Sequence, residues 1–325
     1  MKTIKLIFKG LLLGFDMLTY RLFKKKNAEK SYSFLVELFC LTGGLSNTLI
    51  NNFLKKKNNF PFEISSKKGE VDELENNGYI FKEKFFDRYI IDNINNKILK
   101  LNGKYNGDLM NSSTPEKLNI SKPKATIFRY DQNDLINLPE IQNILTNQYL
   151  LSIAEGYFKS LPIIDTFSAW WSFKTKDDYV DHKAAQSWHF DMDRTKWLKI
   201  FIHLEDVSKD NGPHSFISGT HKNYGIDKII LKQGYKRIDN EIINRLYSKS
   251  KIVQFLGNKG SMLIEDTRGI HKGEPIRKGS RLLLQLQYST AIFGSNINKI
   301  KLPSEKTNQF SNLQKINPQI FENFY

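Results

Sequence analysis

From about residue 162 onward, the chain is a succession of short aromatic and aliphatic segments separated by turn residues. Four of these segments have the length and composition of β-strands, namely FSAWWSFKT, WLKIFIHLEDV, GSMLIED and RLLLQLQYST, which begin at residues 167, 197, 260 and 281. The turn-rich segments KDNGPHSFISGTHK and LGNKGS connect them. Short strands in such a series bury their apolar faces by packing on one another, which predicts a β-barrel or jelly roll.

The chain before residue 162 shows the apolar spacing of amphipathic helices. This spacing runs through residues 4–23, 32–54, 84–101 and 138–157. The polar stretch KKKNNFPFEISSKKGE, residues 55–70, is interpreted as a linker or surface loop, and residues 103–125 are predicted to be a loop. Helices followed by a set of strands predict a mainly β fold that is braced by helices and carries a helical N-terminal extension.

The chain is strongly basic. It carries 49 lysines and arginines against 34 aspartates and glutamates, a formal net charge of +15. Such a charge can attract nucleic acid, anionic lipid or an acidic substrate. Lysine, asparagine and isoleucine are abundant throughout, however, and neither zinc-finger spacing nor a basic region followed by heptads is present. We therefore interpret the charge as general basicity and expect no specific nucleic-acid partner.

Cys40 is the single cysteine, so neither an intramolecular disulfide nor a cysteine metal cluster can form within this sequence. It lies in the apolar run FLVELFC and is predicted to be a buried structural thiol. A sequence without disulfides fits a reducing compartment, and the predicted localisation is cytoplasmic.

Residues 1–26 are basic and apolar but match neither a secretory signal nor a membrane-spanning helix. Lys9 and Asp16 interrupt the apolar run, and lysines flank it on both sides. A spanning helix needs about 20 consecutive apolar residues, which this segment lacks. Two interpretations stay open: a helix docked on the rest of the protein, and a basic amphipathic helix in peripheral contact with a membrane.

The tetrapeptide WHFD at residues 188–191 places a histidine and an aspartate two positions apart. Alternate side chains of a strand share a face, so His189 and Asp191 are expected to project together while Phe190 turns away. A lone pair of this kind is common by chance, and a metal site needs a third ligand. Among the six histidines, His271 is the favoured candidate, because it follows an apolar strand and precedes a glycine- and proline-containing turn. Two histidines and one carboxylate are the ligand set of non-haem Fe(II) oxygenases, with open positions for substrate and oxygen.

Arg281 follows His271 by ten residues and begins the strand RLLLQLQY. A dicarboxylic co-substrate that is bound to iron at one end needs a partner at the other end. A guanidinium binds a carboxylate through two parallel hydrogen bonds, which a lysine cannot do as well. Alone, Arg281 would be interpreted as a surface residue at the start of a strand; at this spacing from His271, it is predicted to bind the co-substrate.

The chain has four other histidines, and each has its own interpretation. His221, in the turn GTHK, is the rival for the third ligand, 30 residues beyond Asp191. His203 lies in the middle of the strand IFIHLED and fits either a pocket-lining residue or a hydrogen-bonded core histidine. His182 and His214 lie in polar stretches and are predicted to be exposed.

Further residues near the predicted site carry two interpretations each. Lys199 and Gln186 are candidate secondary contacts to the co-substrate, or ordinary strand residues. Trp170, Trp171 and Trp188 are interpreted either as walls of an apolar substrate pocket or as barrel core.

The segments WHFD, LEDVSKDNGPHSFISGTHK and IHKGEPIRKGSRLLL, in this order, resemble the phytanoyl-CoA dioxygenase-like family. The second segment is the most distinctive, and the resemblance covers roughly residues 70–295. It implies an Fe(II)- and 2-oxoglutarate-dependent oxygenase built on a double-stranded β-helix, a cupin-like jelly roll. The expected organisation is a helical extension (1–65), an oxygenase domain with bracing helices (70–300) and a C-terminal tail (301–325).

The resemblance also implies roles for individual residues. His189, Asp191 and His271 would be the iron ligands, and Arg281 would bind the distal carboxylate of 2-oxoglutarate. The implied reaction uses O2 and 2-oxoglutarate to hydroxylate an unactivated C–H bond of a small organic substrate, with lipid-like and acyl-carrying molecules among the candidates. Related halogenases replace the carboxylate ligand by a small residue that admits chloride, so Asp191 favours hydroxylation.

Two other classes of function compete with this interpretation. One is a barrel that kept the fold and binds ligands without turnover. A defective set of metal ligands or a missing arginine would indicate such a protein. The other is a basic protein associated with a membrane surface or nucleic acid. A steep salt dependence of its binding to DNA or liposomes would indicate this class.

Overall fold

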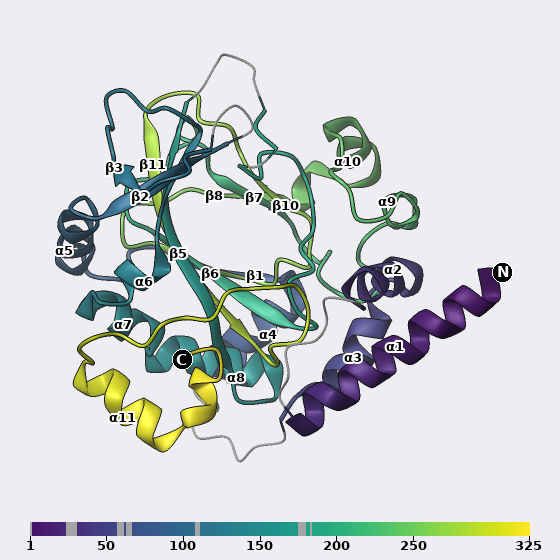
Figure 1. Cartoon of the computed structure of the whole chain (residues 1–325). Helices are drawn as coiled ribbons and strands as arrows, with labels where there is room; N and C mark the ends of the chain where they lie inside the picture. The colour runs from purple at the N-terminus through teal and green to yellow at the C-terminus, as the bar shows by residue number, and fades with distance from the viewer. Residues whose placement is uncertain are drawn as a thin grey trace.

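Figure 1 shows the computed structural model, which describes residues 2–23, 31–56, 62, 67–107, 111–174, 180–182 and 184–325. Two antiparallel sheets face each other across a common interior. The larger has the strand order β1 (Tyr79–Lys82), β9 (Met262–Glu265), β6 (Trp197–His203), β11 (Ser280–Ser289), β5 (Ile163–Phe173), β4 (Ile127–Tyr130), β2 (Asn102–Asn106) and β3 (Glu116–Lys117). The smaller consists of β10 (His271–Gly273), β7 (His214–Ile217) and β8 (Ile252–Phe255).

Helices surround this pair of sheets. Those that precede or interrupt the large sheet are α4 (Lys68–Asn77), α5 (Arg88–Ile98), α6 (Gln132–Leu135), α7 (Pro139–Leu145) and α8 (Gln148–Phe158). The N-terminal region contributes α1 (Lys2–Phe23), α2 (Tyr32–Thr42) and α3 (Leu45–Leu54). The remaining helices are α9 (Lys228–Lys232), α10 (Asn240–Leu246), α11 (Asn308–Ile316) and the short 3₁₀ turns Lys249–Lys251 and Pro318–Phe321.

Strand alternation divides the large sheet into two faces. On β11, Leu282, Leu284 and Leu286 are buried in the main core, which the sheet shares with α4, α5, α7 and α8. Arg281, Leu283 and Gln285 alternate with these leucines and point the other way, and they line a cavity between the sheets.

Strand β6 alternates in the same manner. Ile200 and Ile202 enter the main core, while Lys199 and Phe201 line the cavity. The two strands pair directly, with Leu286 opposite Ile200. Their pairing therefore places the core-facing side chains of both strands on one side of the sheet and the cavity-facing side chains on the other.

The four predicted strands are confirmed as β5, β6, β9 and β11. Shorter strands were not predicted. The loop predicted over residues 103–125 contains most of β2 and the whole of β3, and the connector KDNGPHSFISGTHK contains β7. Strands of two to five residues offer too little alternation to be recognised, and these acquire their structure from the neighbouring strands.

The predicted helices are confirmed, but two of them are divided. The helical pattern of residues 32–54 breaks at Gly43 and Gly44, whose φ angles of 61° and 92° belong to the left-handed region. The pattern of residues 138–157 breaks before α8, where the side chain of Asn147 accepts from the N–H of Leu150 and caps a new helix. Of the predicted linker 55–70, residues 57–61 and 63–66 lie outside the described ranges.

Both ends of the described chain pack against the sheets. Leu13 and Tyr20 of α1 share an apolar cluster with Phe293, and Phe310 of α11 is completely buried in the main core. Cys40, predicted to be buried, is half-buried at the edge of a second cluster. The separation into an extension, an oxygenase domain and a tail stays a prediction.

A buried ion pair ties β5 to the segment that precedes β6. The guanidinium of Arg194 donates from Nε and Nη2 to both carboxylate oxygens of Asp165, at 2.8 and 2.7 Å, and both residues are at most 1% exposed. Replacing Arg194 by methionine leaves a buried carboxylate without its counter-charge. We expect the free energy of unfolding, measured by chemical denaturation, to fall by about 3 to 5 kcal/mol.

The double variant Arg194→Met/Asp165→Leu is the matched control for this prediction. It removes both charges at once, so it should be distinctly more stable than the single Arg194→Met variant. A single variant as stable as the wild type would show that the ion pair contributes nothing to folding.

Candidate metal centre

Backbone pairing places two predicted ligands opposite each other. The N–H of His189 donates to the carbonyl of His271 at 3.0 Å, and the N–H of His271 donates back to the carbonyl of His189 at 2.8 Å. Two residues further on, the N–H of Asp191 donates to the carbonyl of Thr267 at 2.8 Å. The WHFD segment is thus extended and bridged to the region of β10, and main-chain hydrogen bonds bring the three side chains together.

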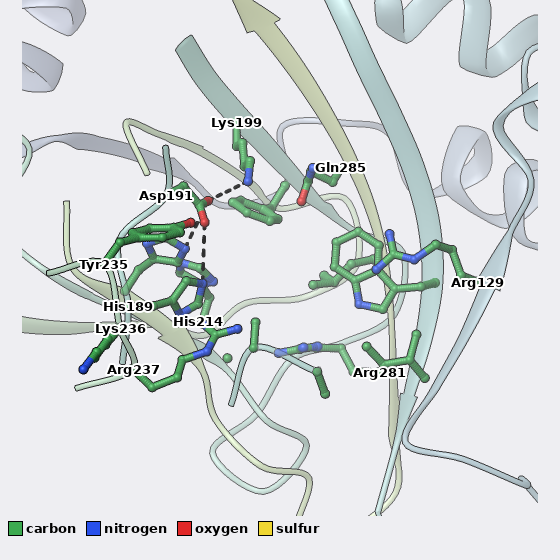
Figure 2. A pocket seen from close by; sticks show the side chains of 18 residues that line it. Arg129, His189, Asp191, Lys199, His214, Tyr235, Lys236, Arg237, Arg281 and Gln285 are labelled. Atoms are coloured by element: carbon green, nitrogen blue, oxygen red, sulfur yellow. Dashed lines mark hydrogen bonds and ion pairs between the residues drawn. The ribbon is translucent and has the colours of Figure 1, made fainter. Parts of the chain in front are cut away.

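The predicted alternation along WHFD holds. Phe190 points away from the cavity into a separate apolar cluster, where it is fully buried and stacks on Phe39 at a ring distance of 5.5 Å. His189 and Asp191 point into the cavity, as Figure 2 shows.

The three side chains have the geometry of a metal site. Nε2 of His189 lies 3.7 Å from Oδ1 of Asp191, and Nε2 of His271 lies 3.5 Å from Oδ2 of Asp191. One ligand atom from each of the three residues lies within 4.8 Å of the others. Such a cluster can hold one ion.

Hydrogen bonds fix the tautomer of both imidazoles. Nδ1 of His189 lies 2.8 Å from the carbonyl of Ser187, and Nδ1 of His271 lies 2.9 Å from the carbonyl of Gly269. A carbonyl only accepts, so Nδ1 carries the proton in each ring and the lone pair of Nε2 faces the cavity. Ligating histidines are held in this manner because the second nitrogen fixes the orientation of the ring.

The electrostatics also suit a cation. Burial lowers the pKa of His189 far below its usual value and lowers that of His271, so both imidazoles are neutral. Burial alone would raise the pKa of Asp191, but the ammonium of Lys199 outweighs it, and the pKa lies well below its usual range. Neutral imidazoles and an ionised carboxylate are the protonation states that bind a metal ion.

Lys199 lies in the cavity, held by two carboxylates. Its Nζ is 2.6 Å from Oδ2 of Asp191 and 3.0 Å from Oδ2 of Asp193. Burial alone would lower the pKa of this ammonium, but the two carboxylates raise it above its usual value. A contact between Lys199 and 2-oxoglutarate stays a prediction, whereas its contact with the aspartate of the cluster is direct.

Arg281 is a buried cation without an anion. Its side chain lines the cavity and is 7% exposed, and the polar atoms Nε and Nη1 have no hydrogen-bond partner. Within the described residues no carboxylate lies within ion-pair distance of the guanidinium, and its one hydrogen bond, from Nη2 to Oγ of Ser172, is long at 3.4 Å. Burial lowers the pKa of Arg281 to about 10. An unsatisfied buried donor costs about 1 to 3 kcal/mol, so this guanidinium is suited to an anionic ligand.

The remaining predicted contacts are divided between cavity and core. Gln186 does not line the cavity; its Oε1 accepts from the N–H of Asp181 at 2.8 Å. Trp170 lines the cavity, whereas Trp171 and Trp188 pack in apolar clusters elsewhere.

The rival histidines are placed outside the ligand cluster. Nε2 of His221 lies 3.1 Å from the carbonyl of Glu75, in a different part of the molecule. His203 is buried beside Phe81 at a ring distance of 6.0 Å and does not line the cavity. His182 is exposed, as predicted.

The prediction that His214 is exposed is wrong. Its side chain is 11% exposed, lines the cavity and stacks on His271 at a ring distance of 5.4 Å. Its Nε2 lies 3.1 Å from Oε1 of Glu265. Burial lowers the pKa of His214 to about 3 and raises that of Glu265 to about 8, so the two share a hydrogen bond as neutral groups. The polar neighbours of His214 in the sequence concealed the pairing of β7 between β10 and β8, which buries it.

Several cavity residues were not recognised in the sequence. The cavity has a volume of about 580 Å³, and its unpredicted lining includes Arg129, Tyr235, Lys236, Arg237 and Gln285. Gln285 shares a strand face with Arg281, four residues away, and alternation could have identified it. Arg129 comes from the unpredicted strand β4, and no local pattern marks it.

Comparison with known proteins gives one family and a set of similar structures. The family model of phytanoyl-CoA dioxygenase (PhyH) matches residues 74–281, more than half of the chain. No curated protein matches the chain in sequence.

The chain is also similar, at low sequence identity, to solved structures. The epimerase SnoN in complex with Fe3+, alpha ketoglutarate and nogalamycin RO is 11% identical, with a TM-score of 0.48 over 70% of this chain and 84% of that protein. HygX from Streptomyces hygroscopicus, with nickel and 2-oxoglutarate bound, is 13% identical, with a TM-score of 0.46 over 74% of this chain and 93% of that one. EctD from S. alaskensis, with 2-oxoglutarate and 5-hydroxyectoine, is 16% identical, with a TM-score of 0.48 over 72% and 78%.

The match of the family model includes the whole ligand cluster and ends at Arg281. The donor set of the cluster fits iron, and the unpartnered guanidinium fits the carboxylate of 2-oxoglutarate. The chain belongs to the phytanoyl-CoA dioxygenase family.

Proposed function

We propose that the protein is an Fe(II)- and 2-oxoglutarate-dependent dioxygenase that hydroxylates an unactivated C–H bond of a small organic substrate. The observation that carries this proposal is the presence, in one cavity, of a His-Asp-His cluster and a buried arginine without an anion. A barrel that only binds ligands would be expected to lack part of this set. We also propose a cytoplasmic location, because a reducing compartment keeps iron in the ferrous state.

Each residue of the cavity has a separate task in this proposal. His189, Asp191 and His271 would hold the iron, which supplies the activation of O2 when it is bound. The carbonyls of Ser187 and Gly269 keep the two rings oriented through their Nδ1 protons.

The co-substrate and the exclusion of water depend on other side chains. Arg281 would bind the distal carboxylate of 2-oxoglutarate with the donors that are now unpaired. Trp170, Phe201 and Leu283 form an apolar wall of the cavity. This wall limits the access of water to the reacting groups.

The charge of the cavity favours an anionic substrate. Among the described residues that line it, Asp191 is the one acidic side chain. Lys199 is paired with it and Arg281 is assigned to 2-oxoglutarate, which leaves the three cations Arg129, Lys236 and Arg237. Arg129 donates to Oγ of Ser168 at 2.6 Å, and Arg237 donates to the carbonyl of His182 at 3.0 Å. Neutral partners leave the charge of both arginines available, so we propose a substrate that carries a carboxylate or phosphate group.

The decisive test is anaerobic addition of Fe(II) and 2-oxoglutarate to the protein. We expect a weak visible charge-transfer band that requires both additions and disappears with a chelator. On admission of O2, the protein should form succinate. Anionic small molecules that are substrates should increase the rate of succinate formation. If neither the band nor succinate forms with a fully folded protein, the proposed function is wrong.

A further inference from the structure

Helix α1 carries two apolar stripes, and one of them packs against the protein. Leu13 and Tyr20 belong to the inner stripe and are at most 5% exposed. The hydroxyl of Tyr20 accepts from the N–H of Ile292 at 2.8 Å, which holds the helix on the body. The inner face of α1 therefore agrees with the first interpretation of residues 1–26, a helix docked on the rest of the protein.

The outer stripe of α1 faces solvent. We define it by five residues, each between 49% and 69% exposed and spaced three or four positions apart: Phe8, Leu11, Phe15, Leu18 and Leu22. Figure 1 shows α1 on the outside of the molecule, beside α2 and α3. Those two helices expose further large apolar side chains, namely Leu41, Leu49 and Phe53.

A stripe of this kind is unlike the scattered apolar residues of an ordinary surface. Spacing of three and four residues along a helix places its members in one row, and this row runs over most of α1. Burial of a single leucine or phenylalanine favours association by about one to two orders of magnitude. The row is therefore suited to an apolar partner that contacts all five of its side chains.

The charges around the stripe indicate the nature of that partner. Residues 1–26 contain six lysines and one arginine against one aspartate. That aspartate, Asp16, is 5% exposed and accepts from Oγ of Ser31 at 2.6 Å, so it does not offset the basic charge at the surface. An apolar helix face within a basic segment is complementary to the headgroups and acyl region of an anionic bilayer.

A second copy of the chain is the other occupant that the spacing would allow, since rows of this spacing also pair in coiled coils. Opposite charges beside the seam favour the pairing of helices, whereas two copies of residues 1–26 would bring like charges together. Within the described ranges, no helix is long and apolar enough to span a membrane. We propose that the outer stripe of α1 binds the surface of an anionic phospholipid membrane, with the helix lying in the plane of the interface.

The test is co-sedimentation of the full chain with vesicles of phosphatidylcholine, with and without phosphatidylglycerol. We expect binding that requires phosphatidylglycerol and weakens as salt is raised. The double variant Leu11→Glu/Phe15→Glu should bind the anionic vesicles at least about tenfold more weakly. The matched control is Tyr89→Glu/Ile316→Glu, which makes the same change of charge at two apolar residues that are each 73% exposed elsewhere.

A second measurement does not depend on how well the glutamate variant folds. The tryptophans at positions 170, 171, 188 and 197 are at most 9% exposed, so their emission should change little when vesicles are added. In the variant Phe15→Trp, a new exposed tryptophan should shift its emission to shorter wavelength on addition of anionic vesicles and not of phosphatidylcholine vesicles.

Three results would overturn the proposal. The first is a wild-type chain that stays in the supernatant with anionic vesicles. The second is a control variant that loses as much binding as Leu11→Glu/Phe15→Glu, which would show that net charge alone is responsible. The third is a wild-type dimer in sedimentation velocity that Leu11→Glu/Phe15→Glu dissociates, because the stripe would then be a contact between copies.

Discussion

Replacing His271 by alanine is expected to abolish both iron binding and formation of succinate. The imidazole has no substitute in the cluster, because His214, its neighbour, is hydrogen-bonded through Nε2 to Glu265. Loss of a residue that merely orients a ligand lowers metal affinity by about 10- to 100-fold, and loss of the ligand itself should exceed that range. Anaerobic titration with Fe(II) against a competing chelator measures the affinity directly.

The control for this prediction is His182→Ala, which removes an exposed imidazole that does not line the cavity. It should bind iron as the wild type does. Circular dichroism establishes that both variants are folded. An unchanged affinity of folded His271→Ala for Fe(II) would remove this residue from the metal site.

Replacing Arg281 by leucine is expected to weaken the binding of 2-oxoglutarate without destabilising the fold. The affinity for 2-oxoglutarate should fall at least about thirtyfold, since truncating one partner of a buried charge pair costs about 2 kcal/mol or more. The free energy of unfolding in the absence of 2-oxoglutarate should stay the same or increase, because the variant removes a buried cation whose Nε and Nη1 are unsatisfied. Titration of the charge-transfer band with 2-oxoglutarate measures the affinity, and chemical denaturation measures the free energy of unfolding.

Measuring affinity and stability together separates a binding role of Arg281 from a structural one. If Arg281 were retained for folding, the leucine variant would be less stable and would lose 2-oxoglutarate only because it unfolds. Arg277→Leu, an exposed position four residues earlier, is the matched control and should change neither quantity. A stable Arg281→Leu variant that still binds 2-oxoglutarate tightly would refute the proposed contact.

The cluster could be predicted from the sequence to the extent that it depends on local geometry. The two-residue period of an extended chain is sufficient to place His189 and Asp191 on one side and Phe190 on the other. The two-residue period cannot predict that His271 joins them, because its place depends on a bridge between two backbone segments that are far apart in the sequence. It was identified by the residues around it and by resemblance to a family.

Predictions failed where the environment of a residue comes from distant parts of the chain. His214 has polar neighbours in the sequence but is covered by the strands that pair on either side of β7. Arg129 reaches the cavity from a strand too short to be recognised. Gln186 does not line the cavity, and its Oε1 accepts from the N–H of Asp181, so its contact with the co-substrate stays a prediction.

The pairing between residues 189 and 271 has a consequence for how the protein acquires its ion. Two reciprocal peptide hydrogen bonds and two carbonyls that anchor the rings fix the positions of the two imidazoles in the folded chain. Many small metal-binding domains are unordered until the ion arrives, and binding must then drive folding. In this protein main-chain hydrogen bonds hold the two imidazoles, so removal of the metal by a chelator is expected to leave the fold intact.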